Sequence, residues 1–360
     1  MYGIYIHVPF CTTRCPYCHF VLIESDGRDR RFDDAVVRHM QASEKIAYAS
    51  VYFGGGTPSL LEPERIARLL AAARGLFDAR DPLEVTLEAN PEALDADRLR
   101  AFRQAGVNRL SIGVQSLRDS ELKFLGRTHS ADDARKAVRA AREAGFVNIV
   151  VDAIFGVPNQ EFGATLGEII EWNPEHVSLY GLTVEKGTEL ERSVKRGLAL
   201  PGDVEQKRDY EMAMDRLGAA GYRHYELSNF AKPGFEAVHN SGYWDGRPYL
   251  GFGPGAHSFV PHRRWANAAN VEKYLAGDRE PVMVEELTRD QRMIEAVFLG
   301  LRRDVGIDVD AFEREFKIIF REHYANALGR ARDTVEWSGT RLKLTRRGRL
   351  LADSVIGAFA

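Results

Sequence analysis

Short apolar runs alternate with longer amphipathic stretches along the first half of the chain. The amphipathic stretches repeat Ala, Leu and charged residues at helical spacing, for example in 62–77, 95–105 and 131–144. Gly106 and Gly145 directly follow two of these stretches and suit helix C-terminal caps. The apolar runs have the length and composition of buried strands, and they lie at residues 4–8, 50–53, 84–87, 109–113, 148–154 and 176–182. Strand–helix alternation of this kind indicates parallel βαβ units.

Six consecutive βα units predict an α/β fold built on a partial (β/α)6 barrel similar to a TIM barrel. The pattern fits an open or a closed barrel, and a doubly wound sheet has the same local alternation. Polar residues gather where the expected strands end, as Glu88 does after 84–87 and Gln115 after 109–113. Barrels place their chemistry at the C-terminal ends of their strands, so these positions favour a barrel.

The pattern changes after about residue 200. We expect residues 1–220 to form the barrel and residues 284–360 to form a small helical, winged-helix-like module. Residues 221–283 connect the two, and their richness in Gly, His and aromatic residues predicts a largely irregular segment. The elements expected in the module are helices at 289–301 and 309–320, a hairpin at 334–344 turning at Ser338-Gly339, and a short final helix.

Composition narrows the class of protein. The chain has 360 residues, 44% of them hydrophobic and 28% charged, with a net charge of −3. This balance provides no basic surface for nucleic acid, so we expect a small molecule or another protein as partner. No apolar run reaches the roughly 18 residues of a membrane span. Residues 1–10 lack a positively charged leader, so the expected location is the cytoplasm.

The three cysteines form one tight cluster. Cys11, Cys15 and Cys18 follow the first expected strand with the spacing C-x3-C-x2-C, and the chain has no other cysteine. An odd number in a reducing compartment argues against disulfides. Soft thiolates select iron–sulfur clusters or zinc. A zinc site with His7 or His19 as fourth ligand is the alternative, but zinc sites more often pair two C-x2-C half-sites.

A 4Fe–4S cluster held by three thiolates leaves its fourth iron open for the amino and carboxylate groups of S-adenosylmethionine. One electron from the cluster can then cleave the sulfonium bond and generate a radical that abstracts hydrogen from a substrate. The triad resembles that of the radical SAM superfamily. The surrounding Tyr5-Ile-His-Val-Pro-Phe-Cys11 is similar to the oxygen-independent coproporphyrinogen III oxidases and their relatives.

This resemblance implies a set of S-adenosylmethionine contacts. The glycine-rich turn after the second strand would meet the methionyl amino group, because glycines allow close backbone approach. The acid after the third strand would bind the ribose hydroxyls, and Tyr5 would lie beside the cluster. The implied contacts are Tyr5, Gly54, Gly55, Gly56, Thr57, Glu88, Gln115, Arg127 and Asp152. Taken singly, each could be a tight turn, a loop residue, a cap or, for Tyr5, a core tyrosine.

Two departures separate the chain from the decarboxylating oxidases. Those enzymes have a fourth cysteine, C-x3-C-x2-C-x-C, where this chain has Phe20 after His19. They also carry an N-terminal extension, whereas this chain starts ten residues before Cys11. Other stretches look closer to the HemW-type haem chaperones, although that branch often has Asp at the position of His19. These stretches are residues 111–117, 125–130 and 224–234, the H-N-x-x-Y-W motif at 239–244, and residues 249–258.

The H-N-x-x-Y-W motif offers groups suited to haem. Imidazole can ligate iron, and Tyr243 and Trp244 present apolar faces to a macrocycle. The resemblance favours His239 as the ligand, with His224 and His257 as competing candidates. The alternative is a packed loop in which His239 only forms hydrogen bonds and the aromatic rings fill the core. We interpret the remaining histidines, such as His39, His176 and His323, as ordinary surface or core residues.

The function implied is that of a haem chaperone, which binds haem as cargo and delivers it to acceptor haem proteins such as respiratory enzymes. Its cofactors would be a 4Fe–4S cluster and S-adenosylmethionine, and no catalytic residue is assigned. The alternative is an oxygen-independent coproporphyrinogen III oxidase, and a remoter one is another radical tetrapyrrole enzyme. The run Arg346-Arg347-Gly-Arg349 is interpreted as a solvated face, with a transient membrane-surface association left open.

Overall fold

Six parallel neighbouring strands form the centre of a twelve-stranded sheet. The structure is a computed structural model that describes residues 1–359, apart from the side chains of Pro82 and Ala93. The six strands are β1 (Tyr2–Val8), β4 (Ala47–Gly55), β5 (Asp78–Ala89), β6 (Arg109–Gln115), β7 (Ile149–Phe155) and β8 (His176–Gly181). All six expected strands are confirmed. Because the sheet ends at β14 and β9 without pairing between them in residues 1–359, the barrel is open.

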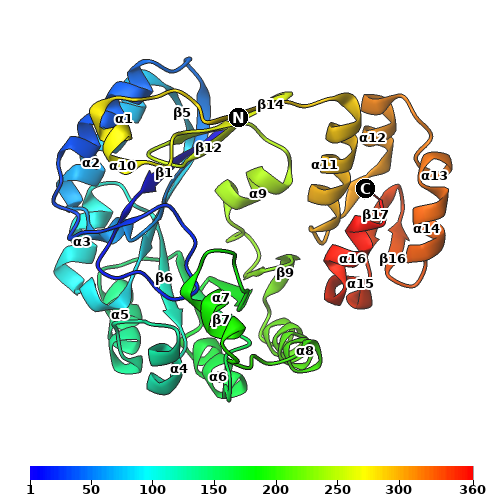
Figure 1. Cartoon of the computed structure of the whole chain (residues 1–360), viewed down its shortest axis with the longest axis horizontal. Coiled ribbons are helices and arrows are strands. Elements are labelled where there is room, and N and C mark those ends of the chain that lie inside the picture. Colours follow the sequence, from blue (N-terminus) through cyan, green and yellow to red (C-terminus); the bar gives the residue numbers. More distant parts are fainter. Residues whose placement is uncertain (360) are drawn as a thin grey trace.

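Helices cover the outer face of this curved sheet (Figure 1). The inner strands are largely buried, as in β6, where six of seven residues are buried. Gly106 and Gly145 adopt φ values of 109° and 84°, which confirms both expected caps. None of the helices in residues 1–359 has the length and apolarity of a membrane span. The outer helices are α1 (Arg31–Gln41), α2 (Pro63–Leu76), α3 (Ala96–Gln104), α4 (Asp119–Phe124), α5 (Ala131–Glu143), α6 (Phe162–Trp172) and α8 (Asp203–Ala219).

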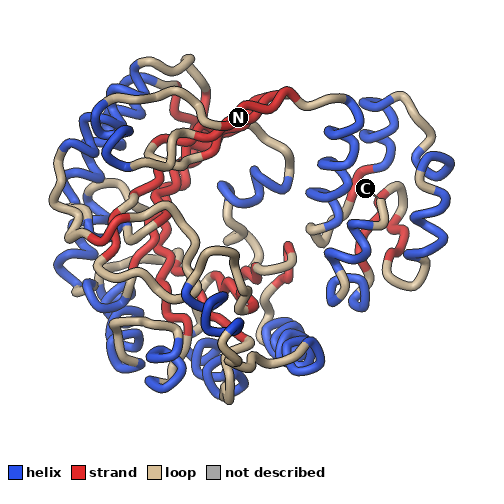
Figure 2. The backbone as a smooth tube through the Cα atoms, viewed as in Figure 1, coloured by secondary structure: helices blue, strands red, loops and turns tan. Residues whose placement is uncertain are grey.

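The segment expected to be irregular extends the sheet at both edges, so that expectation was wrong (Figure 2). One pair of its strands continues the sheet beyond β8, and four others continue it beyond β1. Each is three or four residues long. One strand of each group pairs with a distant strand, β8 or β1, and the others pair with their neighbours in the chain. The elements are β9 (Arg223–Glu226), β10 (Asn229–Ala231), α9 (Val238–Trp244), β11 (Tyr249–Phe252), β12 (His257–Val260), β13 (Arg263–Ala266), α10 (Val271–Ala276) and β14 (Met283–Glu286).

Helix α9 carries the H-N-x-x-Y-W motif and packs on β1 and β4. Figure 1 shows it between the sheet and helix α11 (Arg289–Leu301). The Glu84 carboxylate of β5 accepts hydrogen bonds from the backbone N–H groups of Val238 and His239, at 2.9 Å each. A strand of the barrel therefore fixes the start of this helix.

The C-terminal residues have a hydrophobic cluster of their own, which runs from Met293 to Phe359. The helix 289–301 and the hairpin are confirmed. The helix expected over 309–320 instead ends at Phe316, because Lys317 turns the chain with a φ of 52°. The elements after α11 are β15 (Ile307–Asp308), α12 (Val309–Phe316), α13 (Phe320–His323), α14 (Ala325–Ala331), β16 (Val335–Ser338), β17 (Arg341–Leu344), α15 (Arg346–Leu350) and α16 (Ala352–Gly357).

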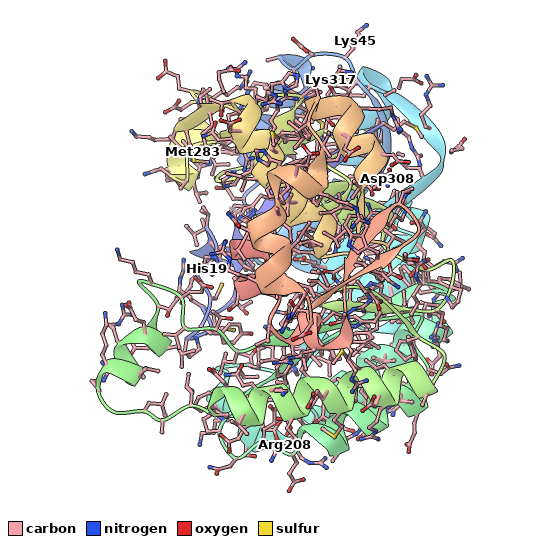
Figure 3. The ribbon with its side chains drawn as sticks, turned by 90° about the vertical axis from the view of Figure 1, so that its right-hand side faces the viewer. His19, Lys45, Arg208, Met283, Asp308 and Lys317 are labelled. Carbon is pink, nitrogen blue, oxygen red and sulfur yellow. The ribbon has the colours of Figure 1, made fainter. Side chains whose placement is uncertain are left out.

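Polar contacts attach this C-terminal module to the barrel. Arg346 forms an ion pair with Asp215 of α8 at 2.6 Å, and Arg349 donates to the His224 carbonyl at 3.0 Å. Arg346 and Arg347 are exposed, as expected of a solvated face, but Arg346 and Arg349 also contact the barrel. Figure 3, which faces the module, shows it in front of the sheet with α8 below it.

Candidate functional site

A cavity of about 380 Å³ opens at the C-terminal ends of the central strands. It collects most of the residues that the sequence analysis selected, from five different strands and the cysteine loop. Tyr5, Gly54 and His239 do not line it. The predicted residues that do are Cys11, Cys15, Cys18, Gly55, Gly56, Thr57, Glu88, Gln115, Arg127 and Asp152.

The cysteine loop is held closed at both ends. It begins in β2 (Phe10–Cys11) and returns to pair with β3 (Ile23–Glu24). Between them, the Arg14 guanidinium donates to the carbonyls of Phe20 at 3.2 Å and Leu22 at 2.9 Å. Arg14 was missed by the sequence analysis, although a basic residue between two of the predicted cluster ligands could have signalled it.

Each cysteine has a different environment around the cavity. The Cys11 thiol lies 3.2 Å from the Thr57 hydroxyl, and the Cys15 sulfur lies 3.8 Å from Nη1 of Arg127. Burial raises the pKa of the Cys18 thiol. Within residues 1–359, no three His, Cys, Asp or Glu side chains converge on the position of a single metal ion. All three cysteines line the cavity, where soft thiolates could hold an iron–sulfur cluster.

The glycine-rich turn clamps β4 to the cysteine strand. The Gly56 N–H donates to the Val8 carbonyl at 2.8 Å, and the Thr57 N–H donates to the Phe10 carbonyl at 2.7 Å. A Cβ on Gly56 would lie 2.4 Å from the Phe10 carbonyl oxygen. Gly55 has a φ of 110°, a left-handed conformation that glycine adopts without strain. The turn is therefore sterically required for placing Cys11.

Two buried acids line the cavity. The Glu88 carboxylate accepts hydrogen bonds from the Tyr52 hydroxyl at 2.7 Å and the Gly55 N–H at 3.1 Å. Burial, together with the nearby Asp152, raises the pKa of Glu88 to about 7. Asp152 accepts from the Ser111 hydroxyl at 2.8 Å, and burial raises its pKa as well. Both acids are thus desolvated groups ready to accept hydrogen bonds from a bound ligand.

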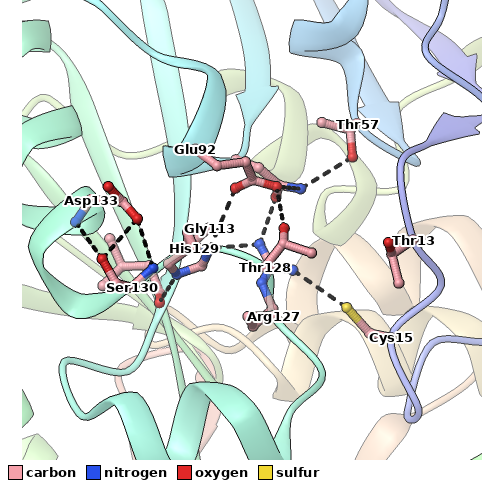
Figure 4. Close-up of polar contacts among 12 residues, drawn as sticks. Thr13, Cys15, Thr57, Glu92, Gly113, Arg127, Thr128, His129, Ser130 and Asp133 are labelled. Atoms are coloured by element: carbon pink, nitrogen blue, oxygen red, sulfur yellow. Dashed lines mark hydrogen bonds and ion pairs between the residues drawn. The ribbon is translucent and has the colours of Figure 1, made fainter.

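Arg127 enters the cavity through a network that Figure 4 shows in close-up. Its Nη2 donates to Oδ1 of Asn90 at 2.6 Å and to the Gly113 carbonyl at 3.2 Å. Behind it, Glu92 accepts from the Thr128 hydroxyl at 2.9 Å and lies 3.5 Å from Nδ1 of His129. Burial would raise the pKa of Glu92, but hydrogen bonds from His129 and Thr128 lower it to about 2.

Gln115 has an unusual backbone and a free acceptor. Its φ is 63°, which is uncommon for a residue other than glycine. Its buried Oε1 has no hydrogen-bond donor among residues 1–359. A buried polar atom without a partner costs about 1–3 kcal/mol, so a ligand donor at this position would be favourable. The thiols, the acids and this amide together fit a cluster with a nucleoside-bearing amino acid.

His239 lies outside the cavity, on the buried side of α9. Its Nδ1 is 2.9 Å from the Ser50 hydroxyl and its Nε2 is 2.8 Å from the Tyr243 hydroxyl. Burial lowers its pKa to about 3. With both ring nitrogens occupied, the geometry agrees with the packed-loop alternative, and an iron ligand would have to break one of these bonds. Tyr5 is also internal, with its hydroxyl 3.1 Å from Nδ1 of His7.

Several cavity residues were missed by the sequence analysis. Tyr52 and Tyr180 reach the cavity from strands assigned only a structural role, and Asn240 reaches it from the H-N-x-x-Y-W motif. Arg109 is 2% exposed, lines the deep end of the cavity and lies 3.9 Å from Glu84. An arginine that opens an apolar strand run could have signalled a buried charge.

Comparisons with known proteins agree with this geometry. The profile of the radical SAM superfamily matches residues 5–171, and that of the HemN C-terminal domain matches residues 287–351. A heme chaperone HemW of Mycobacterium tuberculosis is 39% identical, over 99% of this chain and 94% of its own length. The chain belongs to the HemW family of radical SAM proteins. The Bacillus subtilis heme chaperone HemW is 33% identical, over 100% and 99% of the two chains.

The HemW family assignment is consistent with the architecture. The structure of coproporphyrinogen III oxidase (HemN) from Escherichia coli superposes with a TM-score of 0.84, at 23% identity, over 99% of this chain and 89% of that one. This similarity confirms the partial radical SAM barrel with its C-terminal module. Radical SAM membership implies S-adenosylmethionine and a 4Fe–4S cluster as cofactors.

The contact between Gly56 and Phe10 predicts a large effect of one added methyl group. Gly56→Ala should displace the cysteine strand, lower the free energy of unfolding by about 2 kcal/mol or more and reduce iron content after anaerobic reconstitution. Gly75→Ala is the matched control, since its Cβ would meet nothing within 4 Å. Urea unfolding and iron analysis measure both effects, and equal behaviour of the two variants would contradict the clamp.

The raised pKa of Glu88 predicts a pH dependence of stability. The folded state favours the protonated acid, so this contribution is present below the unfolded pKa near 4.5 and is lost as the pH rises through about 7. Relative to Glu88→Gln, the wild type should lose up to about 3 kcal/mol between pH 5 and pH 8. Anaerobic urea unfolding at both pH values measures this difference, and parallel pH profiles would refute it.

Proposed function

We propose that this protein is a haem chaperone that binds haem and delivers it to acceptor haem proteins. The observation that carries the proposal is its full-length similarity to relatives named heme chaperone HemW, at 33–39% identity. Acceptors such as respiratory haem enzymes and a cytoplasmic site of action are part of the same proposal. The cargo would be haem itself.

We infer that Cys11, Cys15 and Cys18 hold the 4Fe–4S cluster. When bound, the cluster and S-adenosylmethionine supply one-electron and radical chemistry. The chain's own residues hold and orient these groups. The thiols occupy one side of the cavity, where Arg127 places a positive charge beside Cys15. The Gly54-Gly55-Gly56-Thr57 turn keeps Cys11 in place while exposing backbone to the cavity.

The other cavity residues are proposed to bind S-adenosylmethionine. Glu88 is suited to the ribose hydroxyls because its carboxylate is buried yet faces the cavity. The free Oε1 of Gln115 can accept from the ligand, and Asp152 adds a second acceptor. Tyr5 supports this surface from behind, since its ring packs 6.1 Å from that of Tyr52.

An oxygen-independent coproporphyrinogen III oxidase is the second candidate. It is favoured by the structural similarity to the Escherichia coli oxidase, which at 23% identity concerns the fold alone. Phe20 opposes it, because this residue stands where the resemblance places a fourth cysteine in those enzymes. Its side chain lines the cavity and is 53% exposed, so an apolar surface replaces a thiol at the mouth.

Haem titration tests the chaperone proposal. The anaerobically reconstituted protein should show saturable growth of a Soret band, and the bound haem should pass to an apo haem protein in a transfer assay. Cys18→Ser should lose most of the iron while the haem difference spectrum persists, since we place haem outside the cluster cavity. Without saturable haem binding by the wild type, the chaperone proposal fails.

The oxidase alternative has its own assay. Incubation with reductant, S-adenosylmethionine and coproporphyrinogen III should give no protoporphyrinogen, because the fourth cysteine is replaced by Phe20. Authentic oxidase run in parallel shows that the conditions support turnover. Product formation at a comparable rate would make the oxidase the better description.

A further inference from the structure

A cleft separates the barrel from the C-terminal module. Two adjoining cavities of about 610 and 410 Å³ form it, and both lie within the range usual for ligand sites. Helix α9 and the β12–β13 hairpin provide one wall, and α11 provides the other. The cavities share the residues Trp244, Gly246, Phe259, Glu295 and Leu299.

The walls of the cleft expose apolar side chains. On α11, Ile294 is 41% exposed and Phe298 is 40% exposed, and both line the larger cavity. Trp244 and Tyr249 face them from α9 and β11. Exposed apolar groups gathered in one concave site are a mark of ligand binding. A flat apolar molecule fits between two such walls.

Ion pairs hold the two walls together. Arg264 of β13 pairs with Glu295 of α11, and Arg303 pairs with Asp245 at 2.6 Å. The larger cavity is also lined by Arg247 and Glu285, so its charges balance. The cleft is therefore formed in advance, with side chains of both charges at its rim.

Two buried donors beside the cleft lack acceptors. Nε1 of Trp244 and Nε of Arg302 have no hydrogen-bond partner among residues 1–359. The Arg302 guanidinium lies 5.5 Å from the Trp244 ring and 4.9 Å from the Phe298 ring. Its partner Asp353, at 3.2 Å, is 90% exposed, and such surface pairs contribute little. Trp244 lines both cavities, and the Arg302 guanidinium holds the Trp244 and Phe298 rings in place behind the cleft wall.

Among the histidines of residues 1–359, His262 alone lines the cleft. It occupies the tip of the β12–β13 hairpin with a φ of 72°, and its carbonyl accepts from the Leu287 N–H at 2.7 Å. A left-handed residue other than glycine costs about 1 kcal/mol or more, and such strain gathers at ligand sites. His239, by contrast, has both ring nitrogens occupied.

We propose that this cleft is the haem site, with His262 as the iron ligand and with the Trp244 side chain against the macrocycle. The proposal rests on the proposed function for the identity of the ligand. The macrocycle lies between α9 and α11, away from the cysteine cavity, and the iron is ligated without any bond being broken in the porphyrin. The cleft lies between the barrel and the C-terminal module, so haem bound there would contact both.

The apolar wall is tested by adding a charge to it. Phe298→Glu should weaken haem binding about tenfold or more, because the new carboxylate must be desolvated against the macrocycle. Ile319→Glu is the matched control, since Ile319 is 55% exposed in the same module and lines neither cavity. Its haem affinity should stay within about twofold of the wild type by the same reasoning. Thermal unfolding and iron content show that both variants are folded.

The iron ligand is tested at the hairpin tip. His262→Asn removes the imidazole but keeps a residue that tolerates the left-handed conformation. The Soret maximum of the bound haem should shift while the unfolding temperature stays equal or rises. His257→Asn, an exposed histidine on β12, should leave the spectrum unchanged. A residue with only a structural role would alter stability and leave the spectrum as it is.

The outcomes separate the cleft from the function. If the wild type binds no haem, the proposed function itself fails. If the wild type binds haem and Phe298→Glu binds it as well as Ile319→Glu does, the cleft is overturned and the chaperone proposal stands. If the spectrum changes in His257→Asn and not in His262→Asn, the ligand assignment is overturned.

Discussion

The contact between Gly56 and the backbone of Phe10 determines where the cysteines lie. No side chain fits between them, because a Cβ would approach the Phe10 carbonyl oxygen to 2.4 Å. Two backbone hydrogen bonds, from Gly56 to Val8 and from Thr57 to Phe10, then join the second βα unit to the cysteine strand. The cavity forms beside this junction, with thiols on one side and strand ends on the other. A small displacement here would move the ligands of the cluster relative to every residue proposed to hold S-adenosylmethionine.

Buried charge is the second constraint. Glu88, Asp152 and Arg127 all line one cavity, and each is satisfied by a few hydrogen bonds from neighbouring strands. Burial raises the pKa of both acids, so the cavity holds polar groups at a cost in stability. Buried polar groups also lie beside the cleft, where Nε1 of Trp244 and Nε of Arg302 have no hydrogen-bond partner among residues 1–359. The buried polar groups of the cavity lower the stability of the fold, and they are also groups with which a ligand could form hydrogen bonds.

Sequence reasoning succeeded where the signal is local. The six strands, the caps at Gly106 and Gly145 and the helix over 289–301 follow from periodicity and glycine placement. The cysteine spacing and the resemblance to the radical SAM superfamily together selected ten residues that line the cavity. The expectations that failed concern the end of one helix and the strands of the connecting segment. The helix expected over 309–320 ends at Phe316, where Lys317 adopts a positive φ. In the connecting segment, β10 and β11 pair with the distant strands β8 and β1, and the other short strands pair with their neighbours in the chain.

The sequence by itself determined the chemistry of the cluster and the family, because three cysteines at fixed spacing and a glycine turn one βα unit later are short-range features. The tertiary structure alone decided which side of α9 each motif residue faces. It buried His239 against Ser50 and Tyr243, turned Asn240 into the cavity and left Trp244 on the cleft beside α11. The spacing of residues along a seven-residue helix predicts which of them share a face of the helix, but it does not predict which distant residues that face contacts. Those neighbours come from strands and a helix far away in the chain, and packing against them selects which group can meet a ligand.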